Sequence, residues 1–278
     1  FLRPLGLRLI DETWEARELK DRITRISENL GKYLPADFET AVGIMDQIVM
    51  NYGSWLDNYA GFFPGFVELY GRDEANWDIS MAALARYTQY ASSEFAVRWF
   101  IINHEERMMK QMYAWSKDEN ECIRRLASEG CRPALPWGQA LTGFKKDPAP
   151  ILPILRQLKA DSSLHVRKSV ANNLNDISKT HPDLVMELAK DWYGKNAYTD
   201  WIVKHGCRTL LKKGSSEVLA LFGYECAPSV EVQDFRLGET AISIGEDVTF
   251  SFEILAEEAS KIRLEYGIDY VKASGKRN

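Results

Sequence analysis

The sequence of 278 residues predicts a mostly α-helical protein, in which a solenoid of helical repeats is followed by a small β module. Three observations support this prediction. Apolar residues recur at helical spacing up to about residue 225, one block returns 43 positions later, and beyond Pro228 the apolar residues alternate with a period of two. With 45% hydrophobic residues, the chain can bury a sizeable core in one large domain or two smaller ones.

The first predicted helix covers residues 18–34, ELKDRITRISENLGKYL. Its apolar residues fall on one stripe at spacings of four, three and four, and Pro35 then interrupts the pattern. These residues are Leu19, Ile23, Ile26 and Leu30. The stretches FETAVGIMDQIVMNYG, NWDISMAALARYTQY and EFAVRWFIINHEERMMKQMYAWS follow, separated by short breakers that contain Gly or Pro. Short loops between consecutive helices predict an antiparallel succession.

The middle of the chain contains an internal echo. The blocks DENECIRRLASEG (118–130) and DSSLHVRKSVANN (161–173) place an Asp, an apolar residue, an Arg and a further basic residue at a constant offset of 43. A looser third copy, VKHGCRTLL (203–211), aligns with VRKSVANNL (166–174) at an offset of 37. An offset of 43 fits the two-helix unit of a HEAT-like solenoid.

The C-terminal stretches VEVQDFRLG, DVTFSFEIL and KIRLEYGIDYV show the alternation of strands, with β-branched and aromatic residues. They predict an all-β module of three or four strands. Because so few strands make a poor sandwich alone, we expect the module to be incomplete in this sequence or to pack on the solenoid. The predicted domains are a helical domain at residues 1–227 and a β module at residues 228–278.

Composition excludes several classes of protein. The sequence has no run of eighteen apolar residues, so no transmembrane helix and no membrane partner are predicted. The four cysteines are scattered without a CxxC, which favours a reducing compartment over a disulfide scaffold or a zinc ribbon. The histidines lack metal-ligand spacing, and no GxGxxG, Walker or GxSxG motif is present, so neither a metal nor a nucleotide cofactor is expected.

The net charge of −5 hides a basic middle block, because residues 118–217 carry 16 Lys and Arg against 12 Asp and Glu. Several of these charges follow each other at steps of four, which places them on shared helix faces. The basic ones include Arg125, Lys168, Lys204, Arg208 and Lys212, and the carboxylates on these faces are Glu129 and Asp176. One interpretation is ordinary salt bridging on helix surfaces. The other is a phosphate-binding groove that holds carboxylates near a cationic group.

Two further residues have an ordinary and a functional interpretation. Glu94 follows a Ser-Ser helix start, where a glutamate usually complements the helix dipole. Trp137 lies in the loop LPWG, bounded by Pro and Gly. A loop tryptophan often fills a core, but it can also serve as a stacking platform.

Several blocks together resemble the AlkC branch of the bacterial HEAT-like DNA glycosylases. They are SSEFAVR, IRRLASEGCRPALPWG, LPIL, VRKSVANNLNDISKTHPD and RTLLKKG. The resemblance as a whole covers roughly Leu19 to Gly223. The β module is similar to the immunoglobulin-like domain that one AlkC subgroup carries, although it is shorter than a full domain of that type. The resemblance also implies that some N-terminal helices of the family are missing before Phe1.

The resemblance implies a DNA glycosylase, a hydrolase of N-glycosyl bonds in base excision repair. Such an enzyme excises cationic alkylated bases, chiefly 3-methyladenine and 3-methylcytosine, from duplex DNA without base flipping. It assigns active-site roles to Glu94, Glu129, Trp137 and Asp176, with Glu129 central in our interpretation. We further expect a monomer in the bacterial cytoplasm that meets the nucleoid through alkylated double-stranded DNA. From their spacing, we expect Arg125, Arg167, Lys168, Lys204, Arg208 and Lys212 to bind phosphates.

The chemistry of the lesion agrees with such residues. Methylation at N3 gives the base a positive charge and weakens its bond to deoxyribose, so the base leaves neutral and no strong general acid is needed. The sugar becomes oxocarbenium-like, and carboxylates can stabilise that charge and orient water. Two alternatives stay open: a non-enzymatic HEAT-repeat scaffold, and a protein that binds damaged DNA but has lost catalysis.

Overall fold

The computed structural model describes residues 10–52, 58–224, 230–259 and 261–276. The chain divides into two compact units, residues 1–209 and 210–278, which are treated separately below. The boundary that the sequence predicts, between residues 227 and 228, lies outside the described residues. Within the described residues, none of the helices combines the length and the apolar character needed to cross a membrane.

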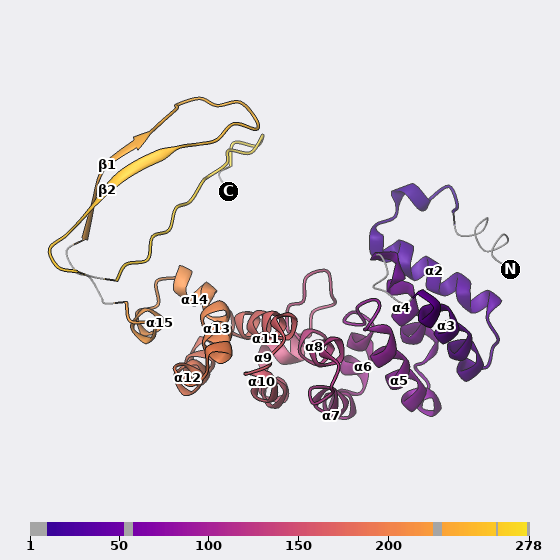
Figure 1. Cartoon of the computed structure of the whole chain (residues 1–278). Helices are drawn as coiled ribbons and strands as arrows, with labels where there is room; N and C mark the ends of the chain where they lie inside the picture. Colours follow the sequence, from indigo (N-terminus) through magenta and orange to yellow (C-terminus); the bar gives the residue numbers. More distant parts are fainter. Residues whose placement is uncertain (1–9, 53–57, 225–229, 260, 277–278) are drawn as a thin grey trace. The chain divides into compact units, whose positions relative to one another are not determined.

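The first unit begins with a cluster of helices (Figure 1). These helices pack around an aromatic core. After the short 3₁₀ turn η1 (Trp14–Ala16) come α2 (Leu19–Tyr33), α3 (Phe38–Tyr52), η2 (Asn58–Gly61), α4 (Phe62–Tyr70), η3 (Glu74–Asn76) and α5 (Trp77–Tyr87). Helix α2 packs on α4, and α4 packs on α5. Phe63, Phe66 and Tyr87 are almost fully buried between them. The helix that the sequence predicts over residues 18–34 is therefore confirmed, with bounds one residue shorter at each end.

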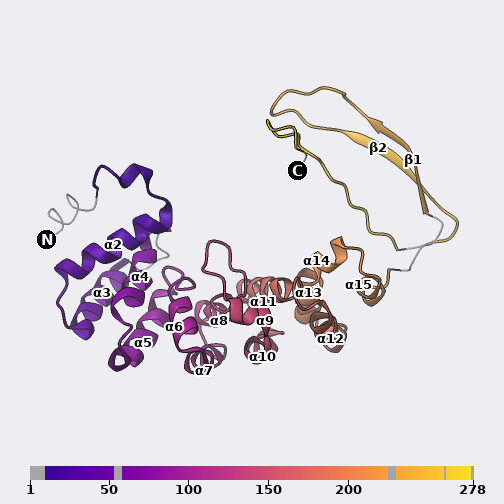
Figure 2. The same ribbon diagram turned by 180° about the vertical axis from the view of Figure 1, so that it is seen from behind.

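The rest of the first unit is a two-layered array of helices. Its elements are α6 (Val97–Asn103), α7 (Glu105–Trp115), α8 (Glu121–Glu129), α9 (Thr142–Lys146), η4 (Ala149–Ile151), α10 (Leu152–Leu158), α11 (Leu164–Ile177), α12 (Pro182–Trp192) and α13 (Ala197–Gly206). Helices α8, α11 and α13 pack side by side in one layer, which we call the inner helices. Helices α7, α10 and α12 form the other, outer layer, as both views show (Figures 1 and 2). This arrangement confirms the predicted HEAT-like repeat.

The sequence echo at an offset of 43 corresponds to a repeated contact. The guanidinium of Arg124 donates to the carbonyl oxygens of Asp118 and Glu119, at 3.0 and 2.7 Å, in the turn before its own helix. Arg167 donates in the same way to the carbonyls of Asp161 and Ser162, at 2.9 and 2.7 Å. Each arginine thus fixes the turn that precedes its own helix, which is α8 for Arg124 and α11 for Arg167.

The second unit contains the end of α14 (Arg208–Lys212), the short helix α15 (Ser216–Leu221), and the antiparallel strands β1 (Val230–Leu237) and β2 (Phe250–Ala256). In the register, Val230 pairs with Ala256 and Leu237 with Phe250, with an irregularity at Asp234, whose φ is +51°. Within the described residues, sheet structure begins only at Val230, as the sequence predicts.

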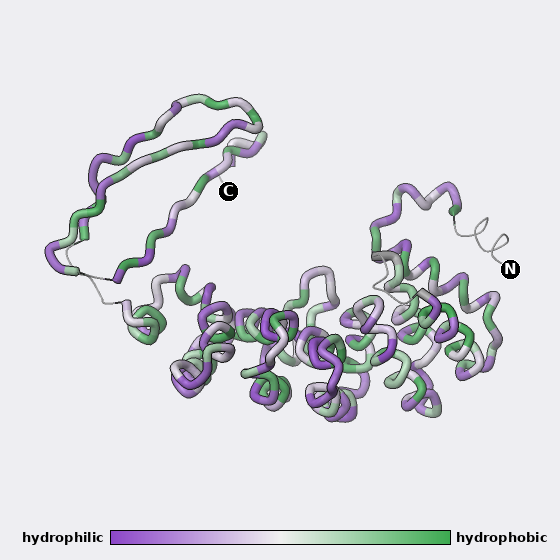
Figure 3. Tube along the Cα trace, viewed as in Figure 1, coloured by the Kyte–Doolittle hydropathy of each residue, from purple (hydrophilic) through white to green (hydrophobic). Residues whose placement is uncertain are grey.

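The prediction of three or four strands is wrong for the described residues, which form a two-stranded sheet. Residues 261–271 keep their alternation but join no ladder with β1 or β2. Alternation determines which side chains share a face, whereas a strand also needs a partner for its backbone hydrogen bonds. Tyr266 and Ile268 accordingly stay 75% and 56% exposed. Figure 3 shows apolar and polar residues alternating along this part of the chain.

Candidate active site

Three carboxylates from separate parts of the solenoid come together at one end of the inner helices. Glu94 lies in the turn before α6, Glu129 is the last residue of α8, and Asp176 lies in the last turn of α11. They alternate with basic side chains in what we call the ion-pair line. Its members, in order, are Glu94, Arg125, Glu129, Arg132, Asp176 and Lys179. The successive nitrogen–oxygen distances are 2.5, 3.7, 2.7, 2.9 and 3.1 Å.

Local spacing explains part of the ion-pair line. Arg125 and Glu129 are four residues apart on α8, and Arg132 follows Glu129 by three, so these pairs share one helix face and its extension. The link from Arg132 to Asp176 is different, because it joins consecutive repeats and depends on the packing of α8 against α11. The three carboxylates therefore meet only because the repeats stack.

The centre of the ion-pair line is buried. Glu129, Arg132 and Asp176 are 6%, 7% and 4% exposed. Burial alone disfavours the charged guanidinium of Arg132, but Glu129 and Asp176 outweigh this effect, so the pKa of Arg132 is raised. Charges this deep require partners, and each of the three has one at hydrogen-bond distance.

Glu94 is held by a serine and an arginine. The hydroxyl of Ser92 donates to Glu94 Oε2 at 2.8 Å and accepts from the backbone N–H of Glu94 at 3.4 Å. Arg125 donates to the same hydroxyl at 2.8 Å. Glu94 is thus bound to a residue of another helix, Arg125 on α8, whereas a simple helix cap would bond only to the first turn of its own helix.

Trp137 extends from the loop after α8 with 85% of its surface exposed. Its φ of +58° lies in the left-handed region, which is costly for a residue with a large side chain. Two hydrogen bonds stabilise this conformation. The amide of Gly138 donates to Leu135 O at 3.0 Å, and the ammonium of Lys20 on α2 donates to Trp137 O at 2.6 Å.

Arg98 binds the backbone at both ends of the Trp137 loop. It is 1% exposed and donates to the carbonyl oxygens of Gly130, Arg132 and Gln139, at 3.0, 3.1 and 2.5 Å. Burial lowers the pKa of Arg98 to about 10, which still leaves it charged at neutral pH. The loop therefore rests on a buried cation that binds backbone carbonyls.

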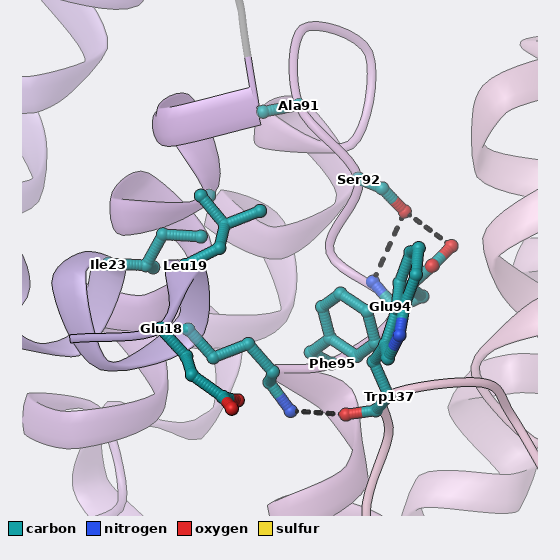
Figure 4. Close-up of a pocket in the computed structure, with 10 residues that line it drawn as sticks. Glu18, Leu19, Ile23, Ala91, Ser92, Glu94, Phe95 and Trp137 are labelled. Atoms are coloured by element: carbon teal, nitrogen blue, oxygen red, sulfur yellow. Dashed lines mark hydrogen bonds between the residues drawn. The ribbon is translucent and has the colours of Figure 1, made fainter. Parts of the chain in front are cut away.

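A cavity of about 520 Å³ opens beside Glu94 and Trp137. Its lining combines aromatic and aliphatic side chains with two carboxylates, and it includes Glu18, Leu19, Glu94, Phe95 and Trp137. Figure 4 shows Phe95, Glu94 and Trp137 on one wall and the residues of α2 on the other. Leu19 is 44% exposed although it belongs to the apolar stripe of α2, because it borders this opening.

The residues predicted to bind phosphates fall into two groups. Lys168, Lys204 and Lys212 are exposed, the first on α11, the second on α13 and the third on α14 in the second unit. The arginines have protein partners. Arg125 belongs to the ion-pair line, and Arg167 also lies over the ring of Tyr198 at 4.2 Å.

The third arginine, Arg208, does not lie on one helix face with Lys204, as its spacing of four had predicted. Arg208 donates to Asn172 Oδ1 at 3.0 Å and to His205 O at 2.8 Å. Lys204 and Arg208 do not share one unbroken helix, because α13 ends at Gly206 and α14 begins at Arg208. The intervening Cys207 interrupts the face that the spacing predicts.

The sequence interpretation missed Arg132, Arg98 and Lys20. Arg132 could have been found, because it follows Glu129 by three residues at a helix end, the spacing of an ion pair. Arg98 and Lys20 bind backbone carbonyls of a distant loop, and no residue type marks such acceptors. Within the described residues, no cluster of three His, Cys, Asp or Glu side chains could hold a metal ion.

Comparison with known proteins gives matches over most of the chain. A family model described as DNA alkylation repair enzyme matches residues 75–210, and a model described as the C-terminal Ig-like domain of the uncharacterised protein YhaZ matches residues 231–278. The solved structure of Pseudomonas fluorescens alkylpurine DNA glycosylase AlkC, bound to DNA containing an abasic site analog, is 38% identical, covers 95% of this chain and 73% of that chain, and superposes with a TM-score of 0.87.

The chain belongs to the AlkC-type family of DNA alkylation repair proteins, in the subgroup with a C-terminal Ig-like domain. The resemblance seen in the sequence is therefore confirmed. YhaZ of Bacillus subtilis (strain 168), an uncharacterised protein, is 48% identical over 268 residues, which is 96% of this chain and 73% of that protein. AlkD2 from Streptococcus mutans is 21% identical, covers 74% of this chain and 95% of that chain with a TM-score of 0.54, and shares the solenoid fold.

Proposed function

We propose that this protein is a DNA glycosylase that hydrolyses the N-glycosidic bond of cationic alkylated bases, chiefly 3-methyladenine and 3-methylcytosine, in double-stranded DNA. On this proposal it acts in base excision repair as a cytoplasmic, nucleoid-associated monomer and needs no cofactor. The observation that carries the proposal is the convergence of Glu94, Glu129 and Asp176 on the ion-pair line, with the exposed Trp137 lining the same cavity as Glu94.

The carboxylates supply a fixed negative charge near the sugar, which the uncatalysed reaction in water lacks. The alkylated base leaves as a neutral molecule, so the developing positive charge lies on the sugar. A fixed carboxylate stabilises that charge without having to reorient during the reaction. Glu129 has the central role, and Asp176 and Glu94 assist it in binding the cation and the attacking water.

The geometry of Glu129 suits activation of water. Its closest ion-pair contacts, from Arg132 and Arg125, both involve Oε1. Among the described residues, no hydrogen bond runs to Oε2. This oxygen can therefore accept a hydrogen bond from a water molecule, while Oε1 stays fixed.

Trp137 contributes a surface rather than a proton. Its ring protrudes from the loop and can contact the deoxyribose or the lesion by CH–π and cation–π interaction. A protruding ring next to Glu94 favours approach of the sugar to the protein over entry of the base into a closed pocket. This supports excision without base flipping.

One observation favours the alternative of a non-catalytic binder of damaged DNA. Along the ion-pair line, three carboxylates are matched by two arginines and a lysine, as in a structural salt-bridge network. In such a protein the line would only join the repeats. A plain scaffold is less well supported, because it needs neither the protruding Trp137 nor its anchors.

Single-turnover release of 3-methyladenine from methylated duplex DNA tests the proposal. The expected result is release well above the spontaneous rate. Binding to the same DNA without release would identify the non-catalytic alternative, and neither binding nor release would identify a scaffold. Parallel reactions with intact single-stranded DNA test the preference for duplex.

A further inference from the structure

Arg132 joins two carboxylates that belong to different repeats. Its Nη1 donates to Glu129 Oε1 at 2.7 Å and its Nε donates to Asp176 Oδ2 at 2.9 Å. The two contacts use two different nitrogens of one rigid, planar group, so they fix the carboxylates relative to each other. The side chain lies between α8 and α11, which pack side by side.

The backbone of Arg132 is itself fixed. Its N–H donates to Glu129 O at 3.2 Å, and its carbonyl oxygen accepts from the buried Arg98 at 3.1 Å. The loop that begins here also carries Trp137. Arg132 therefore connects the end of α8, the Trp137 loop and α11 at one point.

Burial distinguishes Arg132 from a phosphate ligand. The residue is 7% exposed, whereas Lys168 and Lys204 are exposed on the inner helices. Arg125 makes a looser bridge, because its contact with Glu129 is 3.7 Å long. A buried guanidinium with two short contacts has the geometry of a support for the carboxylates.

We propose that Arg132 is a positioning residue for base release, which holds Glu129 and Asp176 in a fixed relative orientation without touching the DNA. The proposal rests on the proposed glycosylase function. Without the bridge, Glu129 keeps its longer contact with Arg125 and Asp176 keeps its contact with Lys179, but no described side chain then holds the two carboxylates relative to each other. The oxygens that face the sugar and the water then lose their alignment. A displacement of about 1 Å in such a site costs about 100-fold in rate.

Two substitutions test this role. Arg132→Gln removes the charge and the fork, and we expect the single-turnover rate of 3-methyladenine release to fall about 100-fold. Arg132→Lys keeps the charge but replaces the rigid fork by a rotatable ammonium, which does not fix the two carboxylates relative to each other, so the rate should recover only in part. The Kd for duplex DNA with an abasic-site analogue should change less than about threefold in both variants, because Arg132 is buried.

Arg124→Gln is the matched control. Arg124 lies on α8, the helix that ends just before Arg132, and forms a short, largely buried ion pair with Asp161, at 2.7 Å, but away from the ion-pair line. Its loss should lower thermal stability to a similar degree while leaving the rate close to parental. An equal loss of rate in Arg124→Gln would show that general destabilisation explains the effect, and would overturn the proposal.

A double-mutant cycle separates positioning from a merely structural role. If Arg132 acts through Glu129, the variant with Arg132→Gln and Glu129→Gln should be about as slow as Glu129→Gln alone. Additive losses, or a folded Arg132→Lys protein with the parental rate, would reject the inference. A parental protein that releases no base would instead reject the proposed function, and the inference with it.

Discussion

The ammonium group of Lys20 donates a hydrogen bond of 2.6 Å to the carbonyl oxygen of Trp137, although 117 positions separate the two residues. The contact ties α2 to the loop after α8 across the cavity beside Glu94. It acts on the residue whose backbone has the left-handed conformation. The N-terminal helix cluster therefore contributes to the conformation of the candidate active site.

Replacing Lys20 by Met should loosen the Trp137 loop. A hydrogen bond of this kind contributes about 0.5–1.5 kcal/mol, so we expect a rate of base release lower by about twofold to twelvefold, with only a small loss of thermal stability. Faster hydrogen exchange at the amides around Gly138 should accompany the loss. Lys32→Met, on the same helix but outside the cavity, is the control. Parental exchange and rate in Lys20→Met would show that the tether is dispensable.

Glu129→Gln should nearly abolish base release. The substitution keeps size and hydrogen-bonding capacity but removes the charge that stabilises the sugar, and the expected loss is about two to three orders of magnitude. DNA binding should persist or improve, because a carboxylate near phosphates is repulsive. Asp176→Asn and Glu94→Gln should show smaller losses of the same kind.

The control for Glu129→Gln is Glu121→Gln, an exposed glutamate in the first turn of the same helix. It should excise at the parental rate. Single-turnover release from methylated duplex, corrected for spontaneous loss, measures all of these variants. A folded Glu129→Gln protein with the parental rate would remove this residue from the mechanism.

DNA binding should depend steeply on salt. Lys168→Ala should weaken binding on any sequence and reduce the slope of log K against log salt by about one unit. Arg208→Ala should do the same, although its contact with Asn172 implies a small additional loss of stability. Lys110→Ala on α7, in the other helix layer, should bind like the parent. If Lys168→Ala and Arg208→Ala both kept the parental slope, Lys168 and Arg208 would not contact phosphates.

Stability should decrease as the pH falls below about 6.5, in part through His205. This ring stacks on Trp201 with centroids 5.1 Å apart, and burial, Arg208 and Lys168 lower its pKa from 6.5. The unfolded chain therefore takes up a proton at a pH where the folded chain does not, so acid favours unfolding until the folded ring also titrates.

Thermal denaturation between pH 8 and pH 5 measures this effect. His205→Gln should flatten the curve, and Lys168→Ala should flatten it partly by removing one of the two charges. A residual slope is expected from His165, whose pKa is also lowered. Curves of equal steepness for the parent and His205→Gln would contradict the assignment.

The sequence predicts the repeat well because its signals are local. Arg124 and Arg167 close turns within six positions, so the echo at an offset of 43 carries a structural meaning that spacing alone reveals. The prediction of a third C-terminal strand was wrong for the described residues. Alternation shows which side chains share a face, but it does not show whether the backbone has a strand to pair with.

The candidate site was predictable only in part. The pair of Arg125 and Glu129 follows from a spacing of four, and the LPWG loop follows from its Pro and Gly. The bridge from Arg132 to Asp176 could not be predicted from the sequence, because it depends on the distance between stacked helices. The three backbone acceptors of Arg98 were equally hidden, since every residue has a carbonyl.

Because of the left-handed backbone at position 137, the residue that gives the most stable protein there differs from the residue that activity requires. An L-residue in this conformation costs about 1–2 kcal/mol, which a glycine would avoid. A search for heat-resistant variants would therefore tend to select Trp137→Gly, and such a protein would melt later while losing the ring that meets the DNA. Engineering of this scaffold for durability should keep position 137 fixed and seek its gains in the outer helix layer.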